Sequence, residues 1–78
     1  MTPAQCRAAR GLLRWTQPQL AEASGVHDAT VGHFENEEVT PRRASLIVIR
    51  RALEAAGVIF VDETGEAGPG VRLRKGLR

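Results

Sequence analysis

The sequence is poor in cysteine, in aromatic residues and in long apolar runs. Its one cysteine, Cys6, has no partner for an internal disulfide, which is typical of a reducing compartment. No apolar run approaches the roughly 18 residues of a membrane span, and the first residues contain no apolar signal core. We therefore expect a cytoplasmic protein without a membrane partner. The 78 residues fit one domain, which is too small for a full enzyme cleft.

Motifs for catalysis and for metal binding are also missing. His27 and His33 have no third ligand at a spacing that suits zinc. The glycines form neither a phosphate loop nor a dinucleotide motif, and Cys6 has no visible catalytic neighbours. The loop that holds Asp62 and Glu66 is too sparse in acidic residues for an EF-hand. We predict that the protein is not an enzyme and that it needs no cofactor, metal or small-molecule ligand.

Arginine, by contrast, is abundant and clustered. Lys75 is the only lysine among the 11 basic residues. The arginines form four groups, the last together with Lys75: Arg7/Arg10/Arg14, Arg42/Arg43, Arg50/Arg51 and Arg72/Arg74/Lys75/Arg78. An isoelectric point near 9.5 fits a polyanionic partner, whereas the net charge of +2 also suits an ordinary surface of mixed charge.

The hydrophobic periodicity predicts four helices, at about 3–13, 17–24, 28–36 and 43–56. Thr2 and Thr16 each precede a glutamine by three residues, which predicts a capping box at the first two helices. Gly25 ends the second helix, and only three residues join it to the third, a spacing typical of a helix-turn-helix. Two strands are predicted after Gly57, at Val58–Val61 and Val71–Arg74.

From Leu13 to Arg43 the chain resembles the phage-repressor and Cro-like (XRE) helix-turn-helix family. The residues that carry the resemblance are Gln17, Leu20-Ala21, Gly25-Val26, Val31, Phe34-Glu35-Asn36 and Thr40-Pro41-Arg42. The resemblance implies a mainly α fold, with a four-helix lambda-repressor-like domain at 1–57. Residues 58–75 would add a two-strand β extension to that domain. The implied partner is a double-stranded DNA operator.

The resemblance also assigns roles to individual residues. The third helix would enter the major groove and present four residues to base edges, because Val31 and Phe34 face inward: His27, Asp28, Ala29 and His33. The resemblance also places Gln17, Asn36 and Arg43 against phosphates. Arg42, beside them, is a further candidate, and Thr30 is near enough on the helix to reach a phosphate. Arg10 and Glu35 occupy positions that pair in this family and would tie the first helix to the third.

Several of these positions allow a second interpretation. Asp28 either accepts a hydrogen bond from cytosine or only favours the positive end of its helix, and acidic Asp28 and small Ala29 depart from the family pattern. Gln17 either meets a phosphate or is a helix cap that touches nothing. Gly32 either permits a close approach to DNA or has no special role. Cys6 is a core residue or a functional thiol, and Trp15 covers the core or stacks on a ligand.

We predict a sequence-specific transcriptional regulator, acting as a homodimeric repressor. An isolated two-stranded hairpin is marginally stable, so we expect the strands of two subunits to pair. Such pairing would hold the recognition helices near the roughly 34 Å spacing of adjacent major grooves. The residues expected at this interface are Val58, Ile59, Phe60, Val61, Val71 and Leu73. The alternative is a protein-interaction module, such as an antitoxin or antiactivator.

Overall fold

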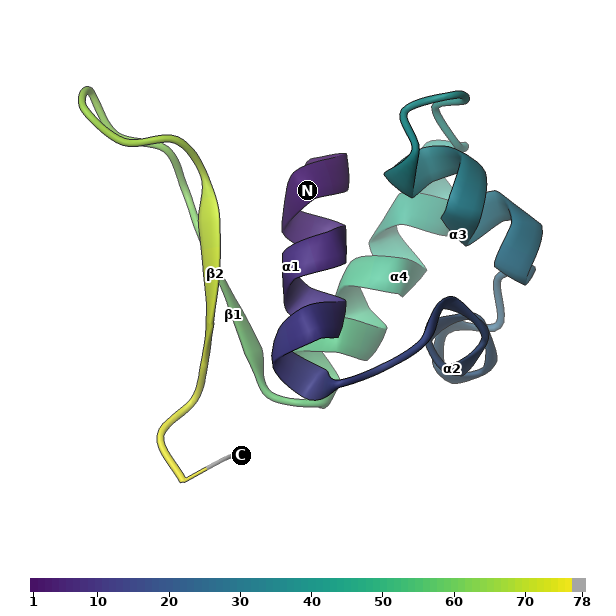
Figure 1. Ribbon diagram of the computed structural model, residues 1–78, viewed down its shortest axis with the longest axis horizontal. Helices are drawn as coiled ribbons and strands as arrows, with labels where there is room; N and C mark the ends of the chain where they lie inside the picture. The colour runs from purple at the N-terminus through teal and green to yellow at the C-terminus, as the bar shows by residue number, and fades with distance from the viewer. Residues whose placement is uncertain (77–78) are drawn as a thin grey trace.

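The structure, a computed structural model, describes residues 1–76 and contains four helices followed by a hairpin (Figure 1). Arg78 of the last basic cluster lies outside these residues. The elements are α1 (Pro3–Leu13), α2 (Gln17–Ser24), α3 (Asp28–Glu35), α4 (Arg43–Ala55), β1 (Val58–Val61) and β2 (Gly70–Leu73). The predicted mainly α fold with a two-strand extension is confirmed. Helices α3 and α4 each end one residue earlier than predicted, and β2 is shifted by one residue.

Local sequence explains where the first two helices begin and end. Both predicted capping boxes form: Thr2 and Thr16 accept hydrogen bonds from the backbone three residues later, and the glutamines there bond back. Gly25 ends α2 in the left-handed conformation, with φ of 76°. Arg14 ends α1 in the same conformation without a glycine, at φ of 57°. The turn between α2 and α3 is therefore as short as the sequence indicates.

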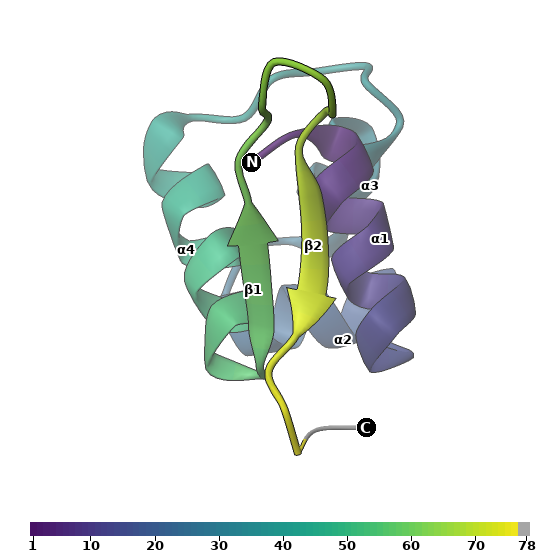
Figure 2. The ribbon, with the colours of Figure 1, turned by 90° about the vertical axis from the view of Figure 1, so that its left-hand side faces the viewer.

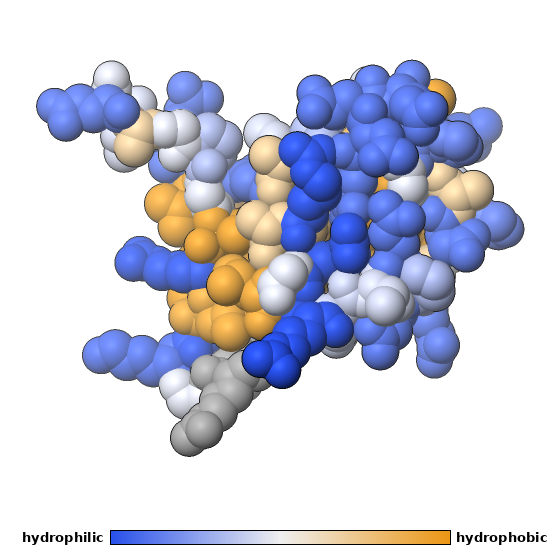
Figure 3. Space-filling view, in the orientation of Figure 1, coloured by the Kyte–Doolittle hydropathy of each residue, from blue (hydrophilic) through white to orange (hydrophobic). Residues whose placement is uncertain are grey.

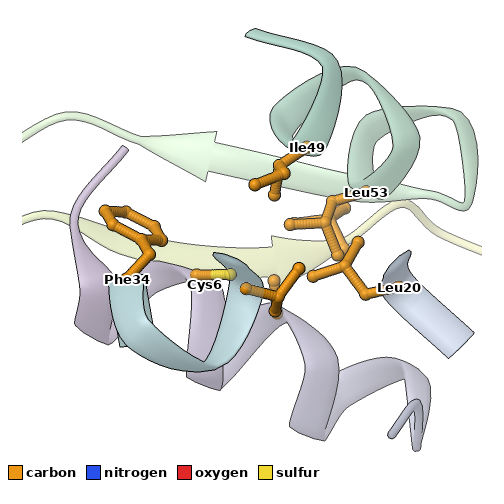
Figure 4. Close-up of a cluster of buried hydrophobic side chains, with 8 residues drawn as sticks. Cys6, Leu20, Phe34, Ile49 and Leu53 are labelled. Atoms are coloured by element: carbon orange, nitrogen blue, oxygen red, sulfur yellow. The ribbon is translucent and has the colours of Figure 1, made fainter. Parts of the chain in front are cut away.

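The core lies where all four helices and the hairpin meet. Figure 4 shows Cys6 of α1, Leu20 of α2, Phe34 of α3 and two α4 residues, Ile49 and Leu53, around one cluster. Ala9, Val31 and Val58 complete the buried set, and Trp15 packs against it while partly exposed. Trp15 thus covers part of the core. Because α3 buries one side in this cluster, its other side faces outward.

The hairpin forms a layer over the helices instead of standing alone. β1 and β2 are antiparallel and pair Val58 with Leu73 and Phe60 with Val71. Figure 2 shows the two strands in front of α4 and α1. These four side chains pack against the helical core, and Val58 is only 3% exposed. The side chain of Gln5 adds hydrogen bonds from α1 to the carbonyls of Val61 (3.4 Å) and Gly70 (3.0 Å).

This packing corrects the expectation that the hairpin needs a second subunit. The strands pair within one chain, and the chain's own helices bury Val58, which is therefore unavailable to a partner. Strand alternation places Ile59 and Val61 on the outer face, and Ile59 is 39% exposed. Figure 3 shows hydrophobic surface on the hairpin side and mostly hydrophilic surface over α2 and α3.

Within residues 1–76, no helix has the length and apolar character needed to cross a membrane.

Candidate nucleic-acid interface

The outward side of α3 and the start of α2 together form a polar surface with a shallow hollow. The hollow has a volume of about 320 Å³. It is lined by Gln17 and Pro18 of α2, by Asp28, Ala29, Gly32 and His33 of α3, and by Asn36 and Glu38 after it. Most of the residues predicted to read bases or to bind phosphate therefore lie on one surface. Arginine and lysine are absent from the lining, and two carboxylates are present.

All four predicted base-reading residues are exposed at α3. His27 is the N-cap residue: its Nδ1 accepts a hydrogen bond of 3.1 Å from the backbone N–H of Ala29. Asp28 lies in the first turn, where a negative charge is favourable, and its Oδ1 is 3.2 Å from His27 Nδ1. His33 Nδ1 lies 3.1 Å from Oε1 of Glu38. Nδ1 of each histidine thus already has a partner within the chain.

The residues predicted to contact phosphate differ in their exposure and in the contacts that they make within the chain. Asn36, Arg42 and Arg43 are exposed, and Thr30 is half-buried. Arg42 is the residue before α4, and Arg43 is its first residue. Gln17 has a contact that neither sequence interpretation included, because its Nε2 donates to Glu35 Oε1 at 3.1 Å. Its backbone N–H lies in the first turn of α2, where such groups have no partner within the helix.

A buried carboxylate joins α1, α2 and α3 beneath this surface. Glu35 is 1% exposed, and its two oxygens accept from Arg10 Nε at 2.7 Å and from Arg10 Nη2 at 2.6 Å. The structure thus brings together the two residues that the resemblance pairs. Arg10 Nη1 also donates to the carbonyl of Trp15 at 2.9 Å, and Arg7 donates to the carbonyl of Glu35. This network fixes the end of α3 relative to α1.

The charges in this network shift the pKa values of its members. Burial would raise the pKa of Glu35, but the hydrogen bonds from Arg10, Cys6 and Gln17 and the charge of Arg10 together lower it. The hydrogen bond to Glu35 raises the pKa of Arg10 despite its partial burial. The pair therefore remains ionised at neutral pH, and the ion pair is a permanent part of the fold.

Cys6 belongs to the same network as a hydrogen-bond donor. Its Sγ donates to Glu35 Oε2 at 3.1 Å, and the residue is fully buried. Burial raises the pKa of the thiol strongly, and the hydrogen bond and charge of Glu35 raise it further. A thiol held protonated in the core is unreactive. Of the two interpretations left open by the sequence, the structure favours the core residue.

Gly32 has a role that the sequence did not reveal. A Cβ atom at this position would lie 3.3 Å from Oε1 of Gln17. The side chain of Gln17 therefore crosses the surface of α3 at Gly32 on its way to Glu35. A close approach to DNA is not needed to explain this glycine.

Glu38 is the residue of the hollow that sequence reasoning missed. It lies in the loop after α3, outside any periodic pattern, and its pairing with His33 depends on the path of that loop. Glu37 turns the chain at φ of 60°, a conformation that glycine usually adopts at the end of a helix. Glutamate gives no sequence signal for this turn. Across residues 1–76, no group of three or more His, Cys, Asp or Glu side chains is placed to hold a metal ion.

The comparisons with known proteins agree with this arrangement of helices. Residues 7–57 match the family model described as helix-turn-helix. A search of curated proteins gives no significant match. The matched segment covers α2, α3, α4 and most of α1, and it ends at the glycine before the hairpin. It covers more than half of the chain, so the protein belongs to the Cro/repressor-like (XRE) family of helix-turn-helix DNA-binding proteins.

Proposed function

We propose that the protein is a sequence-specific transcriptional repressor of the cytoplasm, without enzymatic activity, that inserts α3 into the major groove of an operator. The observation that carries this proposal is the fixed position of α3. Val31, Phe34 and Glu35 bury its inner side, while His27, Asp28, Ala29 and His33 are exposed on its outer side. A major groove about 12 Å wide accepts one such helix. The four exposed residues would then face base edges.

The phosphate contacts of this proposal surround the base-reading helix. The first turn of α2 offers the backbone N–H of Gln17, since Pro18 has none and that of Gln19 bonds to Thr16 Oγ1, and the positive end of the helix dipole favours a phosphate there. Arg42 and Arg43 supply charge after α3, and Thr30 and Asn36 add polar groups. Because the hollow itself carries Asp28 and Glu38, the attraction to DNA depends on these flanking groups.

We further propose that a second copy of the chain binds the outer face of the hairpin. Ile59 and Val61 supply its apolar part. The loop at one end is exposed and acidic, with Asp62, Glu63 and Glu66, and the other end is exposed and basic, with Arg72, Arg74 and Lys75. Two hairpins that meet in antiparallel orientation bring the acidic loop of one copy over the basic strand of the other. Charge complementarity therefore supports a symmetric homodimer.

The position of the hairpin limits the operator spacing that such a dimer can span. It lies on the opposite side of α1 and α4 from α3 (Figure 1), and the chain is 31 Å along its longest axis. Two copies joined through their hairpins place the recognition helices at the two ends of the dimer. Twice that length is an upper limit on the separation of the two recognition helices in such a dimer. The spacing of about 34 Å between adjacent major grooves lies within this limit and stays our prediction.

A protein-interaction module is the second candidate, and the carboxylates of Asp28 and Glu38 in the hollow favour it, because they repel phosphates. The two functions differ in how binding depends on salt. We would titrate the DNA upstream of the protein's own gene, and a random duplex of equal length, at several salt concentrations. A regulator binds the first more tightly and loses affinity steeply as salt rises. Equal, weak binding to both duplexes favours the interaction module.

A further inference from the structure

In both histidines of the proposed base-reading surface, the ring nitrogen Nδ1 has a hydrogen-bond partner. The partner is an acceptor at His33 and a donor at His27. His33 Nδ1 faces the carboxylate of Glu38 at 3.1 Å, whereas His27 Nδ1 faces the backbone N–H of Ala29 at 3.1 Å. In a neutral imidazole one nitrogen carries the hydrogen and the other accepts. The partner at Nδ1 therefore decides what Nε2 can do, and Nε2 is the atom left for a base.

At His33 the partner is an acceptor. An ionised carboxylate has no hydrogen to donate, so the neutral ring must carry its hydrogen at Nδ1 to bond Glu38. Nε2 of His33 is then an acceptor. The backbone also keeps the two residues together, because the N–H of Glu38 donates to the carbonyl of His33 at 2.9 Å. Between them, the backbone of Glu37 is left-handed at φ of 60°, and the side chain of Glu37 takes no part in the contact.

At His27 the partner is a donor. The N–H of Ala29 caps α3 and needs a lone pair at Nδ1, so the neutral ring carries its hydrogen at Nε2. Asp28 Oδ1 is also 3.2 Å from this nitrogen and by itself favours a hydrogen on it, but the hydrogen bond formed there is the cap from the N–H of Ala29, which needs the lone pair of Nδ1. Nε2 of His27 is then a donor.

We propose that Glu38 is a specificity-determining residue, which sets His33 to read amino bases while His27 reads keto bases. In the major groove adenine and cytosine present amino donors, whereas guanine and thymine present carbonyl acceptors at the equivalent position. An acceptor at His33 bonds the amino group of adenine or cytosine and is repelled by the carbonyl of guanine or thymine. A donor at His27 has the opposite preference. This inference rests on the proposed function, and Glu38 acts through His33 without touching DNA.

The first measurement uses the free protein and does not depend on DNA binding. Nitrogen-15 spectra of the imidazole rings at pH 8 distinguish the two tautomers of each histidine. We expect hydrogen at Nδ1 of His33 and at Nε2 of His27. Glu38→Ala should change the His33 signature and leave that of His27 unchanged. Glu37→Ala is the matched control, since it removes the same charge from the adjacent position, whose carboxylate lies near Arg7 (3.9 Å). A wild-type His33 ring with hydrogen at Nε2 would overturn the proposal.

The second measurement is a selection of bound duplexes from a random library, with the three proteins at pH 8. The wild type and Glu37→Ala should select adenine or cytosine at one position, by about fivefold or more over guanine and thymine. Glu38→Ala should lose this preference while it keeps the others. If Glu38→Ala keeps the preference, the assignment of Glu38 is wrong. If the wild type selects no sequence at all, the base-reading roles and the proposed function both fail, whatever the tautomers are.

Discussion

Removing the carboxylate of Glu35 should destabilise the fold more than any change of an exposed charge. In Glu35→Ala, four side-chain hydrogen bonds to the carboxylate are lost: two from Arg10 and one each from Cys6 and Gln17. The guanidinium of Arg10 then remains without its partner. Breaking a buried ion pair costs about 3–5 kcal/mol. The side chain of Arg10 is 20% exposed and regains some water, so we expect a loss of about 3 kcal/mol in the free energy of unfolding.

Urea denaturation and thermal melting measure this loss directly. For a domain of this size a loss of about 3 kcal/mol lowers the Tm by roughly 12–24 °C. Glu54→Ala is the matched control, because Glu54 pairs with Arg50 on the surface of α4, where both side chains are more than 40% exposed. The control should change stability by about 0.5 kcal/mol or less. An equal Tm for Glu35→Ala and the wild type would refute the role given to the buried pair.

The pH dependence of stability provides an independent test of the same pair. The pKa of Glu35 is lowered in the folded protein, whereas an unfolded glutamate has a pKa of about 4.3. The stabilisation is therefore complete above about pH 4.3 and declines as the pH falls toward the lowered pKa. Glu35→Gln, which cannot ionise, should lose less stability than the wild type between neutral and acidic pH. Identical acid profiles of the two proteins would show that the carboxylate is not the group responsible.

Four further predictions concern the surface and the core. Arg43→Ala should weaken binding to all DNA sequences and lower the salt slope by about one contact per subunit; an unchanged slope would remove Arg43 from the interface. Gly32→Ala should stabilise by less than the roughly 1 kcal/mol expected in an open helix, because the new methyl group would lie 3.3 Å from Oε1 of Gln17, whose amide is bonded to Glu35; the full gain in urea denaturation would show that Gln17 yields freely. Cys6 should react with a thiol reagent only after unfolding, and rapid reaction of the native protein would contradict its burial. Ile59→Glu should shift sedimentation toward the monomer, whereas Leu12→Glu, at a side chain of equal exposure on α1, should not; equal effects would exclude the hairpin as the specific interface.

Much of the fold follows from local signals in the sequence. The capping boxes at Thr2 and Thr16 and the left-handed Gly25 act within a few residues, so helix starts and the short turn could be predicted. The left-handed turns at Arg14 and Glu37 could not, since neither residue favours that conformation. Both turns close hydrogen bonds back to the preceding helix, from the N–H of Trp15 to the carbonyl of Arg10 and from the N–H of Glu38 to the carbonyl of His33. The place of the hairpin also depends on contacts distant in sequence, such as the bonds from Gln5 to Val61 and Gly70, which periodicity does not predict.

At the candidate site, too, the exposure of side chains could be predicted from the local sequence, whereas their contacts could not. Exposure of His27 and His33 follows from the helical period once Val31 and Phe34 are placed in the core. The partners of these side chains do not follow from it. The contact between His33 and Glu38 depends on a loop, and that between Gln17 and Glu35 crosses between two helices at a glycine. The sequence therefore predicts which side chains share this surface, whereas the contacts among them come from the structure.

The most direct test of the central claim is a selection of fragments from the protein's own genome that bind the full chain at physiological salt. We expect the enriched fragments to share a pseudo-palindromic sequence, with half-sites a whole number of helical turns apart. Replacing the exposed α3 residues Ala29 and His33 should abolish the enrichment, while α1–α4 remain folded. Recovery of fragments without a common sequence, or the same enrichment with the α3 variant, would contradict the claim that this helix reads DNA.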